Sequence, residues 1–189
     1  SNFYLAEALY NEKQQSASIP HYNYVTDQER NEFTEQALSR LSQAYLEANN
    51  WSKAMPILER LEEQADFPQN ITFAQSNLMK GHYELENYAA AVDYAERVLT
   101  RPKLENRVKS DARVIIARSA FKTGDERKAQ DAYEEVNKIA KGELKAEALY
   151  YDAYFKHQEG SYKVSNTVVQ KLVADYSAYK YFGAKGLIV

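Results

Sequence analysis

A short pattern recurs along this chain: a polar or glycine-containing turn is followed by a small residue near the start of an apolar helix. Four copies are clear, around Ala54, Ala91, Ala129 and Ser165, and a weaker copy surrounds Ser18. The small residues at 18, 54, 91, 129 and 165 are separated by 36, 37, 38 and 36 residues, the period of a helix-turn-helix repeat. One helix pair cannot bury its apolar face alone, so such pairs stack in an array. The sequence therefore predicts an all-α chain, an α-α superhelical solenoid of antiparallel helix pairs with about 10–11 helices.

The small residues also predict where each repeat begins and ends. We expect a single solenoid over residues 1–189, with repeats at about 3–28, 31–68, 70–105, 108–141 and 143–176 and a partial repeat over 178–189. The final residues, from Gly186 to Val189, continue an apolar helical pattern without a stop signal. We therefore expect this chain to be an excerpt of a longer array.

Local signals predict several helix ends within the repeats. In the second repeat, Ser52 is the expected N-cap of the second helix, and Pro68 is expected to close the repeat. Pro56 would then lie in the first turn of that helix, where a missing backbone N–H has no intrahelical partner anyway. Gly124 and Gly142 are predicted to be helix C-caps, because glycine adopts the left-handed conformation that such a cap requires.

One position does not fit the repeat. Counting back from Tyr162 in the register of the other repeats places Lys156 where an apolar residue is expected. We therefore expect an extra residue in that turn or a local change of register.

Composition and charge exclude several classes of protein. The net charge is -3, and the 24 basic and 27 acidic residues are interspersed, which argues against a nucleic-acid-binding protein because phosphate neutralisation needs clustered cations. No apolar run is long enough to span a membrane, so we expect no direct membrane insertion in this segment. The absence of cysteine excludes disulfides, thiolate zinc sites and cysteine nucleophiles.

The chain also lacks the motifs of common active sites. The three histidines, at positions 21, 82 and 157, are far apart, and none has the spacing of a metal site. No phosphate-binding glycine loop and no nucleophile elbow occurs. We therefore expect a protein that is not an enzyme, with no catalytic residues, no metal and no cofactor.

The repeated residues resemble the tetratricopeptide repeat over roughly residues 3–189. The resemblance depends on aromatic-x-x-small signatures, on an aromatic residue late in the first helix and on trailing prolines: Trp51/Ala54, Tyr88/Ala91 and Tyr162/Ser165, then Tyr45, Tyr83 and Phe121, then Pro68 and Pro102. Residues 145–151 and 158–162 look more narrowly similar to outer-membrane-assembly and Tol-associated tetratricopeptide proteins. The whole chain is similar to long multi-repeat proteins of Bacteroidetes. Glu126 departs from the pattern, because an aromatic residue is usual there.

The resemblance implies a protein-binding scaffold in which the first helices of the repeats line a concave groove for a peptide or a partner domain. By helical phase, the groove candidates in this sequence are Phe73, Asn77, Lys80, Tyr83, Arg118, Phe121, Lys122, Tyr150 and Tyr154. Aromatic rings and cations in this arrangement suit an extended peptide with apolar and acidic side chains. The alternative for Tyr83 and Phe121 is that their rings pack between repeats.

Three functions agree with this sequence. The first is a non-enzymatic protein-protein interaction scaffold. The second is a structural spacer or self-associating array within a larger envelope protein, with the exposed terminal helices packing on neighbouring repeats. The third is a regulatory repeat domain of an enzyme whose active site lies elsewhere. The narrower resemblance favours the periplasm or cell envelope of a Gram-negative bacterium.

Overall fold

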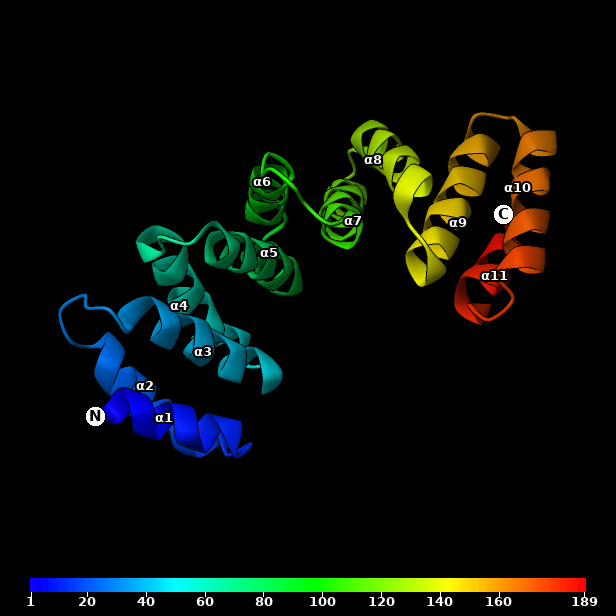
Figure 1. Cartoon of the computed structure of the whole chain (residues 1–189). Coiled ribbons are helices and arrows are strands. Elements are labelled where there is room, and N and C mark those ends of the chain that lie inside the picture. Colours follow the sequence, from blue (N-terminus) through cyan, green and yellow to red (C-terminus); the bar gives the residue numbers. More distant parts are fainter. The chain divides into compact units, whose positions relative to one another are not determined.

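The computed structural model describes all residues, 1–189, and contains eleven α-helices and no strand (Figure 1). The predicted all-α fold class is therefore confirmed. The helices are α1 (Asn2–Asn11), α2 (Gln15–Thr26), α3 (Thr34–Glu47), α4 (Trp51–Gln64), α5 (Pro68–Glu84), α6 (Tyr88–Leu99), α7 (Asn106–Lys122), α8 (Glu126–Ile139), α9 (Gly142–Gln158), α10 (Tyr162–Asp175) and α11 (Lys180–Gly186).

The chain divides into two compact parts, Ser1–Gly81 and His82–Val189, and the boundary falls within α5. In the N-terminal part, α1 packs on α2, α2 on α3 and α3 on α4. In the C-terminal part, the same succession runs from α6 to α10, and α11 packs on both α9 and α10. Within each part, helices from α1 to α4 and from α6 to α10 therefore pack on their neighbours in the sequence, as expected of a repeat array.

The five small residues of the sequence pattern occupy one structural position. Each is the fourth residue of the second helix of a pair: Ser18 in α2, Ala54 in α4, Ala91 in α6, Ala129 in α8 and Ser165 in α10. All five are buried. The prediction that the small residues mark the second helices is confirmed. Ser165 also bonds across its pair, because its hydroxyl donates to the Ala153 carbonyl at 2.8 Å.

The turn inside each helix pair has one repeated geometry. In the fifth pair, the Ser161 N–H donates to the Lys156 carbonyl at 2.8 Å, and the Gly160 N–H donates to the His157 carbonyl at 2.9 Å. This is the Schellman arrangement, in which a left-handed residue ends the helix and satisfies its last carbonyls. The left-handed residues of the five pairs have φ between 52° and 81°: Lys13, Asn49, Glu86, Gly124 and Gly160. Gly124 lies directly after Thr123, the C-cap of α7, and supplies the left-handed conformation that was the reason for its prediction as a cap.

The prediction of an irregular turn near Lys156 was wrong. The turn after Lys156 contains no extra residue, and its hydrogen bonds match those of the other four pairs. Lys156 occupies the place of Tyr45 in the second pair, whose carbonyl accepts the equivalent bond. A lysine is accepted there because its long side chain reaches solvent, where its ammonium bonds Glu159 at 3.3 Å.

Three predictions about the helix ends of the second repeat differ from the structure. Asn50, rather than Ser52, is the N-cap of α4, and its side-chain oxygen accepts a bond from the Lys53 N–H at 3.2 Å. The helix therefore starts earlier than expected, so Pro56 is its sixth residue and lies beyond the first turn. A proline there removes the N–H that would bond the Ser52 carbonyl. Pro68 begins α5 instead of closing the preceding repeat, in agreement with the preference of proline for a first helical position.

Gly142 also differs from its prediction. It is the first residue of α9, with φ of 60°, rather than the C-cap of α8, which ends at Ile139. Its left-handed backbone turns the chain from α8 into α9.

The last predicted helix is present but short. It covers seven residues, Lys180–Gly186, and its Phe182 joins a buried cluster with Tyr150 and Leu172. None of the eleven helices is both long and apolar enough to cross a bilayer.

Candidate interaction surface on the first helices

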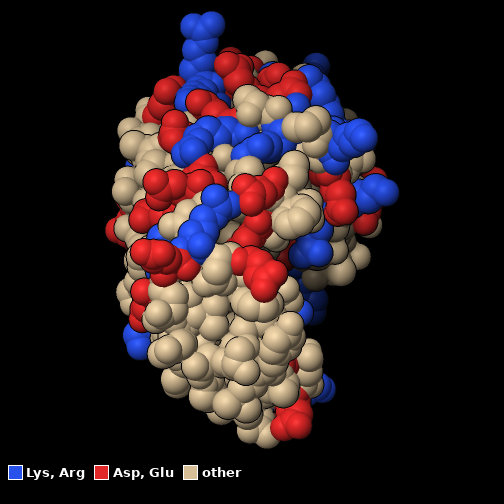
Figure 2. All heavy atoms as spheres, turned by 60° about the vertical axis from the view of Figure 1, so that its left-hand side comes forward, with Lys and Arg blue, Asp and Glu red and all other residues tan.

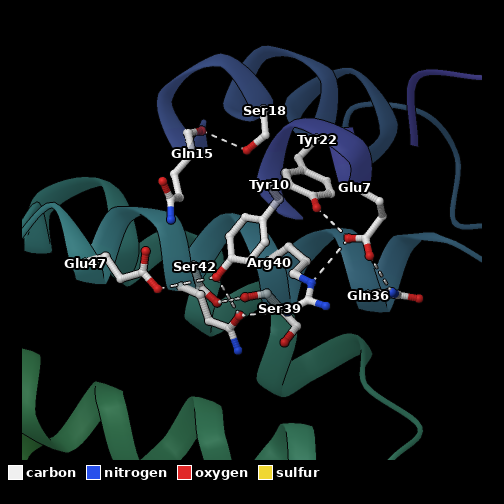
Figure 3. Close-up of polar contacts among 11 residues, drawn as sticks. Glu7, Tyr10, Gln15, Ser18, Tyr22, Gln36, Ser39, Arg40, Ser42 and Glu47 are labelled. Carbon is white, nitrogen blue, oxygen red and sulfur yellow. Dashed lines mark hydrogen bonds and ion pairs between the residues drawn. The ribbon is translucent and has the colours of Figure 1, made fainter. Parts of the chain in front are cut away.

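The first helices of the N-terminal part are joined by a carboxylate that three side chains bond. Glu7 of α1 accepts hydrogen bonds from the Tyr22 hydroxyl at 2.5 Å, from Arg40 Nε at 3.2 Å and from Gln36 Nε2 at 3.2 Å (Figure 3). Tyr22 comes from α2, and the other two donors come from α3. One carboxylate therefore holds three helices together.

A second group of contacts continues along the same surface. The Tyr10 hydroxyl bonds Gln43 at 3.2 Å and Glu47 at 3.4 Å, and the Arg40 guanidinium lies 4.8 Å from the centre of the Tyr10 ring (Figure 3). Cation-π and hydrogen-bond contacts thus occupy these side chains of α1 and α3. In this part, they bind α1 to α3.

A related network lies in the C-terminal part. Arg118 of α7 donates from Nε to Glu147 Oε1 at 2.7 Å and from Nη2 to Glu147 Oε2 at 2.5 Å. The Tyr133 hydroxyl of α8 donates to the same carboxylate at 2.9 Å. The Glu147 side chain is only 3% exposed, so the pair is a buried, bidentate ion pair. Neither Glu147 nor Tyr133 was predicted from the sequence as a site residue.

This network determines whether the Arg118 guanidinium is available to bind a partner. Its hydrogen bonds to Glu147 raise its pKa, so the guanidinium stays charged and paired. Arg118 was predicted to meet an acidic group of a partner, but in the structure it meets an acidic group of the next repeat. A partner that recruited Arg118 would have to break a bond that holds α7 to α9.

Burial raises the pKa of Tyr133, and burial together with the Glu7 hydrogen bond raises the pKa of Tyr22. A raised folded-state pKa means that the stability from these hydroxyls is complete below about pH 10 and is lost as the pH rises further. We expect the free energy of unfolding, measured with urea, to fall above about pH 10. Tyr133→Phe should make that fall shallower. The control Tyr162→Phe, at a ring that is 62% exposed, should leave it unchanged. An identical alkaline fall in both variants would contradict the assignment.

Aromatic rings surround the network in the C-terminal part. The Phe121 ring lies 5.0 Å from that of Tyr151 and 5.7 Å from that of Tyr154, both nearly perpendicular, while Tyr133 and Tyr151 are stacked at 4.1 Å. Such contacts add to the packing of α7, α8 and α9. Phe121 therefore packs between repeats, which was the alternative left open for it. Tyr154 is only partly buried and keeps an accessible edge.

Tyr150 and Tyr154 line a cavity of about 350 Å³ together with His157, Gln158, Lys185, Ile188 and Val189. The Lys185 ammonium lies 4.7 Å from the centre of the Tyr150 ring and 5.2 Å from that of Tyr181. The structure thus brings two predicted residues together with a cation that sequence reasoning missed. Only the contact of α11 with α9 brings Lys185 there, and its sequence gave no indication of it.

The other predicted residues lie in both parts. Lys122 is exposed at the end of α7, and Tyr83 is half-buried, with its ring 5.7 Å from that of Tyr88 and its pKa raised by burial. In the N-terminal part, Asn77 donates to the Phe73 carbonyl at 2.9 Å. The predicted set divides between the parts: Phe73, Asn77 and Lys80 lie in the first, and Tyr83, Arg118, Phe121, Lys122, Tyr150 and Tyr154 lie in the second.

The ionisable side chains show no metal site. No group of three or more histidine, aspartate or glutamate residues is arranged to hold a metal ion.

Comparisons with known proteins agree with this geometry. A family model for the tetratricopeptide repeat matches residues 36–66, which cover most of α3 and all of α4. A crystal structure of MamA superposes with a TM-score of 0.70 over 89% of this chain and 92% of that chain. The chain has the fold of a tetratricopeptide-repeat solenoid. The identity to MamA is 17%, so this likeness describes the fold.

Two further structures share this tetratricopeptide-repeat fold. MamA from Desulfovibrio magneticus RS-1 has a TM-score of 0.68 and 10% identity, and covers 92% of each chain. The TPR-like repeats of a Podosopora anserina kinesin light chain have a TM-score of 0.59 and 15% identity, also over 92% of each chain. No curated protein matches the sequence.

Proposed function

We propose that this tetratricopeptide-repeat chain is a non-enzymatic protein-interaction scaffold that binds an extended, acidic peptide segment of a partner along α7, α9 and α11. The fold supports a role in binding proteins, since stacked helix pairs present extended surfaces. The peptide would run past Lys122 and reach the cavity beside Tyr150 and Tyr154. Arg118 takes no part, because Glu147 holds it.

The observation that carries this proposal is the environment of Lys185. Its ammonium lies over two tyrosine rings at the edge of the cavity, and the strongest side-chain interactions that act on it come from Tyr150, Tyr151 and Tyr181. A cation beside tyrosine side chains attracts an anionic group, while the aromatic wall accepts an apolar side chain. A peptide with an acidic residue next to an apolar one supplies both.

Selection from a display library of short random peptides tests this proposal. We expect the peptides bound by the chain to be enriched in acidic residues, and we expect Lys185→Glu to weaken their binding about ten-fold or more, equivalent to about 1.4 kcal/mol. Lys163→Glu is the matched control, because Lys163 is exposed on α10, a second helix. Peptides that bind all three proteins equally, or that show no preference for acidic residues, would count against the site.

A second candidate is a self-associating array, and the surface of α1 and α2 favours it. Figure 2 shows blue and red atoms interspersed over the upper part of the visible face and a mostly tan area toward its lower end, where α1 and α2 lie in Figure 1. Tyr4 and Leu5 of α1 and Tyr24 of α2 are exposed by 64%, 48% and 56%. If this surface associates, light scattering should give a mass above one chain, and Leu5→Glu with Tyr24→Glu should restore the monomer. A monomer at all concentrations would eliminate this candidate.

The proposed cellular location follows only from the narrower resemblance. It is the periplasm or cell envelope of a Gram-negative bacterium, and fractionation of the native host would test it.

A further inference from the structure

The two buried networks occupy the same places in the repeat. Glu7 and Arg118 each lie six residues before the left-handed turn residue of their pair, at positions 13 and 124. Tyr22 and Tyr133 each lie nine residues after those same turn residues. Tyr22 donates to Glu7 directly, whereas Arg118 and Tyr133 are joined through Glu147, to which both donate. Both networks therefore use equivalent positions of the first and second helices of one pair.

The next repeat contributes from an equivalent position as well. Gln36 and Glu147 each lie thirteen residues before the turn residue of the following pair, at positions 49 and 160. Gln36 bonds Glu7, and Glu147 bonds Arg118. Arg40, one helical turn after Gln36, adds the charge that neutralises Glu7. The two stacking interfaces thus use one architecture.

The charges in the two networks are reversed. Between the first and second pairs, the earlier repeat supplies the carboxylate, Glu7, and the later repeat supplies the cation, Arg40. Between the fourth and fifth pairs, the earlier repeat supplies the cation, Arg118, and the later repeat supplies the carboxylate, Glu147. We propose that these reversed charges determine which repeat stacks on which.

Burial of the carboxylates makes this charge matching selective for the correct neighbouring repeat. Glu147 and Glu7 have side chains only 3% and 18% exposed, so little water reaches either carboxylate. If the face of the first pair accepted α9 in place of α3, Glu7 would meet Glu147. Two carboxylates would then be buried together without a cation, an arrangement that strongly disfavours the wrong stack.

A correctly matched pair adds much less than a mismatch costs. The attraction inside a buried ion pair is largely offset by the loss of hydration, so a well-packed apolar replacement is often as stable. The networks therefore select the correct neighbour more than they raise stability. This property matters in a repeat array, where every interface has a similar shape and misassembly is a characteristic failure.

Charge exchange in the full chain tests the proposal. Arg118→Glu and Glu147→Arg, made singly, should each lower the Tm by about 6 to 20 °C, because each places like charges together. The double variant should return the Tm to within about 5 °C of the natural chain. Its fourth and fifth pairs would then have the same charge order as the first and second.

The decisive measurement is the fraction of monomer after refolding from urea at high protein concentration, by size-exclusion chromatography. The double variant should lose monomer to dimers and larger species, because Glu7 of one chain can now pair with the guanidinium that Glu147→Arg introduces in another. Exchange of the surface pair Asp93 and Arg97, at 3.7 Å on one helix, is the control and should leave the monomer fraction unchanged. A double variant that regains its Tm and refolds as cleanly as the natural chain would overturn the proposal.

An apolar variant keeps the proposal testable if the charge exchange does not fold. Arg118→Met, Tyr133→Phe and Glu147→Leu together should give a Tm equal to or above that of the natural chain, yet less monomer after refolding. A large loss of Tm with full recovery of monomer would show that the network serves stability alone, and would overturn the selective role.

Discussion

Glu147→Ala should lower the free energy of unfolding by about 3 kcal/mol, the lower end of the range for removing one partner of a buried ion pair. The variant leaves the Arg118 guanidinium without its bidentate partner and the buried Tyr133 hydroxyl without an acceptor. We choose the lower end because the Arg118 side chain is 35% exposed, so water can solvate part of the freed charge. Urea unfolding followed by circular dichroism measures the change.

Two further variants show whether the loss comes from the network. Glu143→Ala changes the same residue type on the same helix at an exposed position, and should stay within about 0.5 kcal/mol of the natural chain. Arg118→Met in the Glu147→Ala background should recover part of the stability, since it removes the charge left unpaired. If Glu147→Ala costs no more than Glu143→Ala, the ion pair is not a structural contact.

Glu147 shows why part of the site could not be predicted from the sequence. A glutamate on a helix with lysine neighbours is most often solvated, so nothing in the local pattern marks it as buried. Its partner Arg118 is 29 residues away in the sequence, and only the stacking of α7 on α9 brings the two together. The one available signal was the repeat register itself, which places charged residues at positions 7 and 118 and tyrosines at positions 22 and 133.

The fold was predictable because every repeat carries the same information. The small residue at the fourth position of each second helix and the turn before it recur five times, so an unclear copy such as that around Ser18 is located by the others. Helix ends were less predictable. Asn50 and Ser52 are both good N-caps two residues apart, and the choice between them depends on where the Schellman turn at Asn49 ends the previous helix.

The aromatic residues of the predicted groove illustrate the same limit. Helical phase places Phe121, Tyr150 and Tyr154 on first helices, but phase does not show how far the next repeat covers each ring. Phe121 lies among the rings of α9, whereas Tyr150 and Tyr154 border a cavity. How far each ring is covered depends on the neighbouring helix. The structure is therefore needed to separate the predicted groove residues that pack between repeats from those that remain candidates for binding.

Replacing one of the small residues that define the repeat with a larger residue is a stringent test of the fold. Ala129 is fully buried in a cluster with Val114, Ala117 and Ala120 of α7. These four residues leave room only for a close approach of the two helix backbones, so a larger side chain has no unoccupied space to enter.

Ala129→Leu should therefore lower the free energy of unfolding by about 1 to 3 kcal/mol, which corresponds to a fall in Tm of about 2 to 12 °C in a chain of this size. The added atoms must push α8 away from α7 or adopt a strained rotamer, and either response disturbs the neighbouring Tyr133 and its bond to Glu147. Ala174→Leu makes the same substitution at an exposed position of α10, and should change the Tm little. Equal melting temperatures for the two variants would mean that the crossing tolerates large residues, and the periodic small residue would then need another explanation.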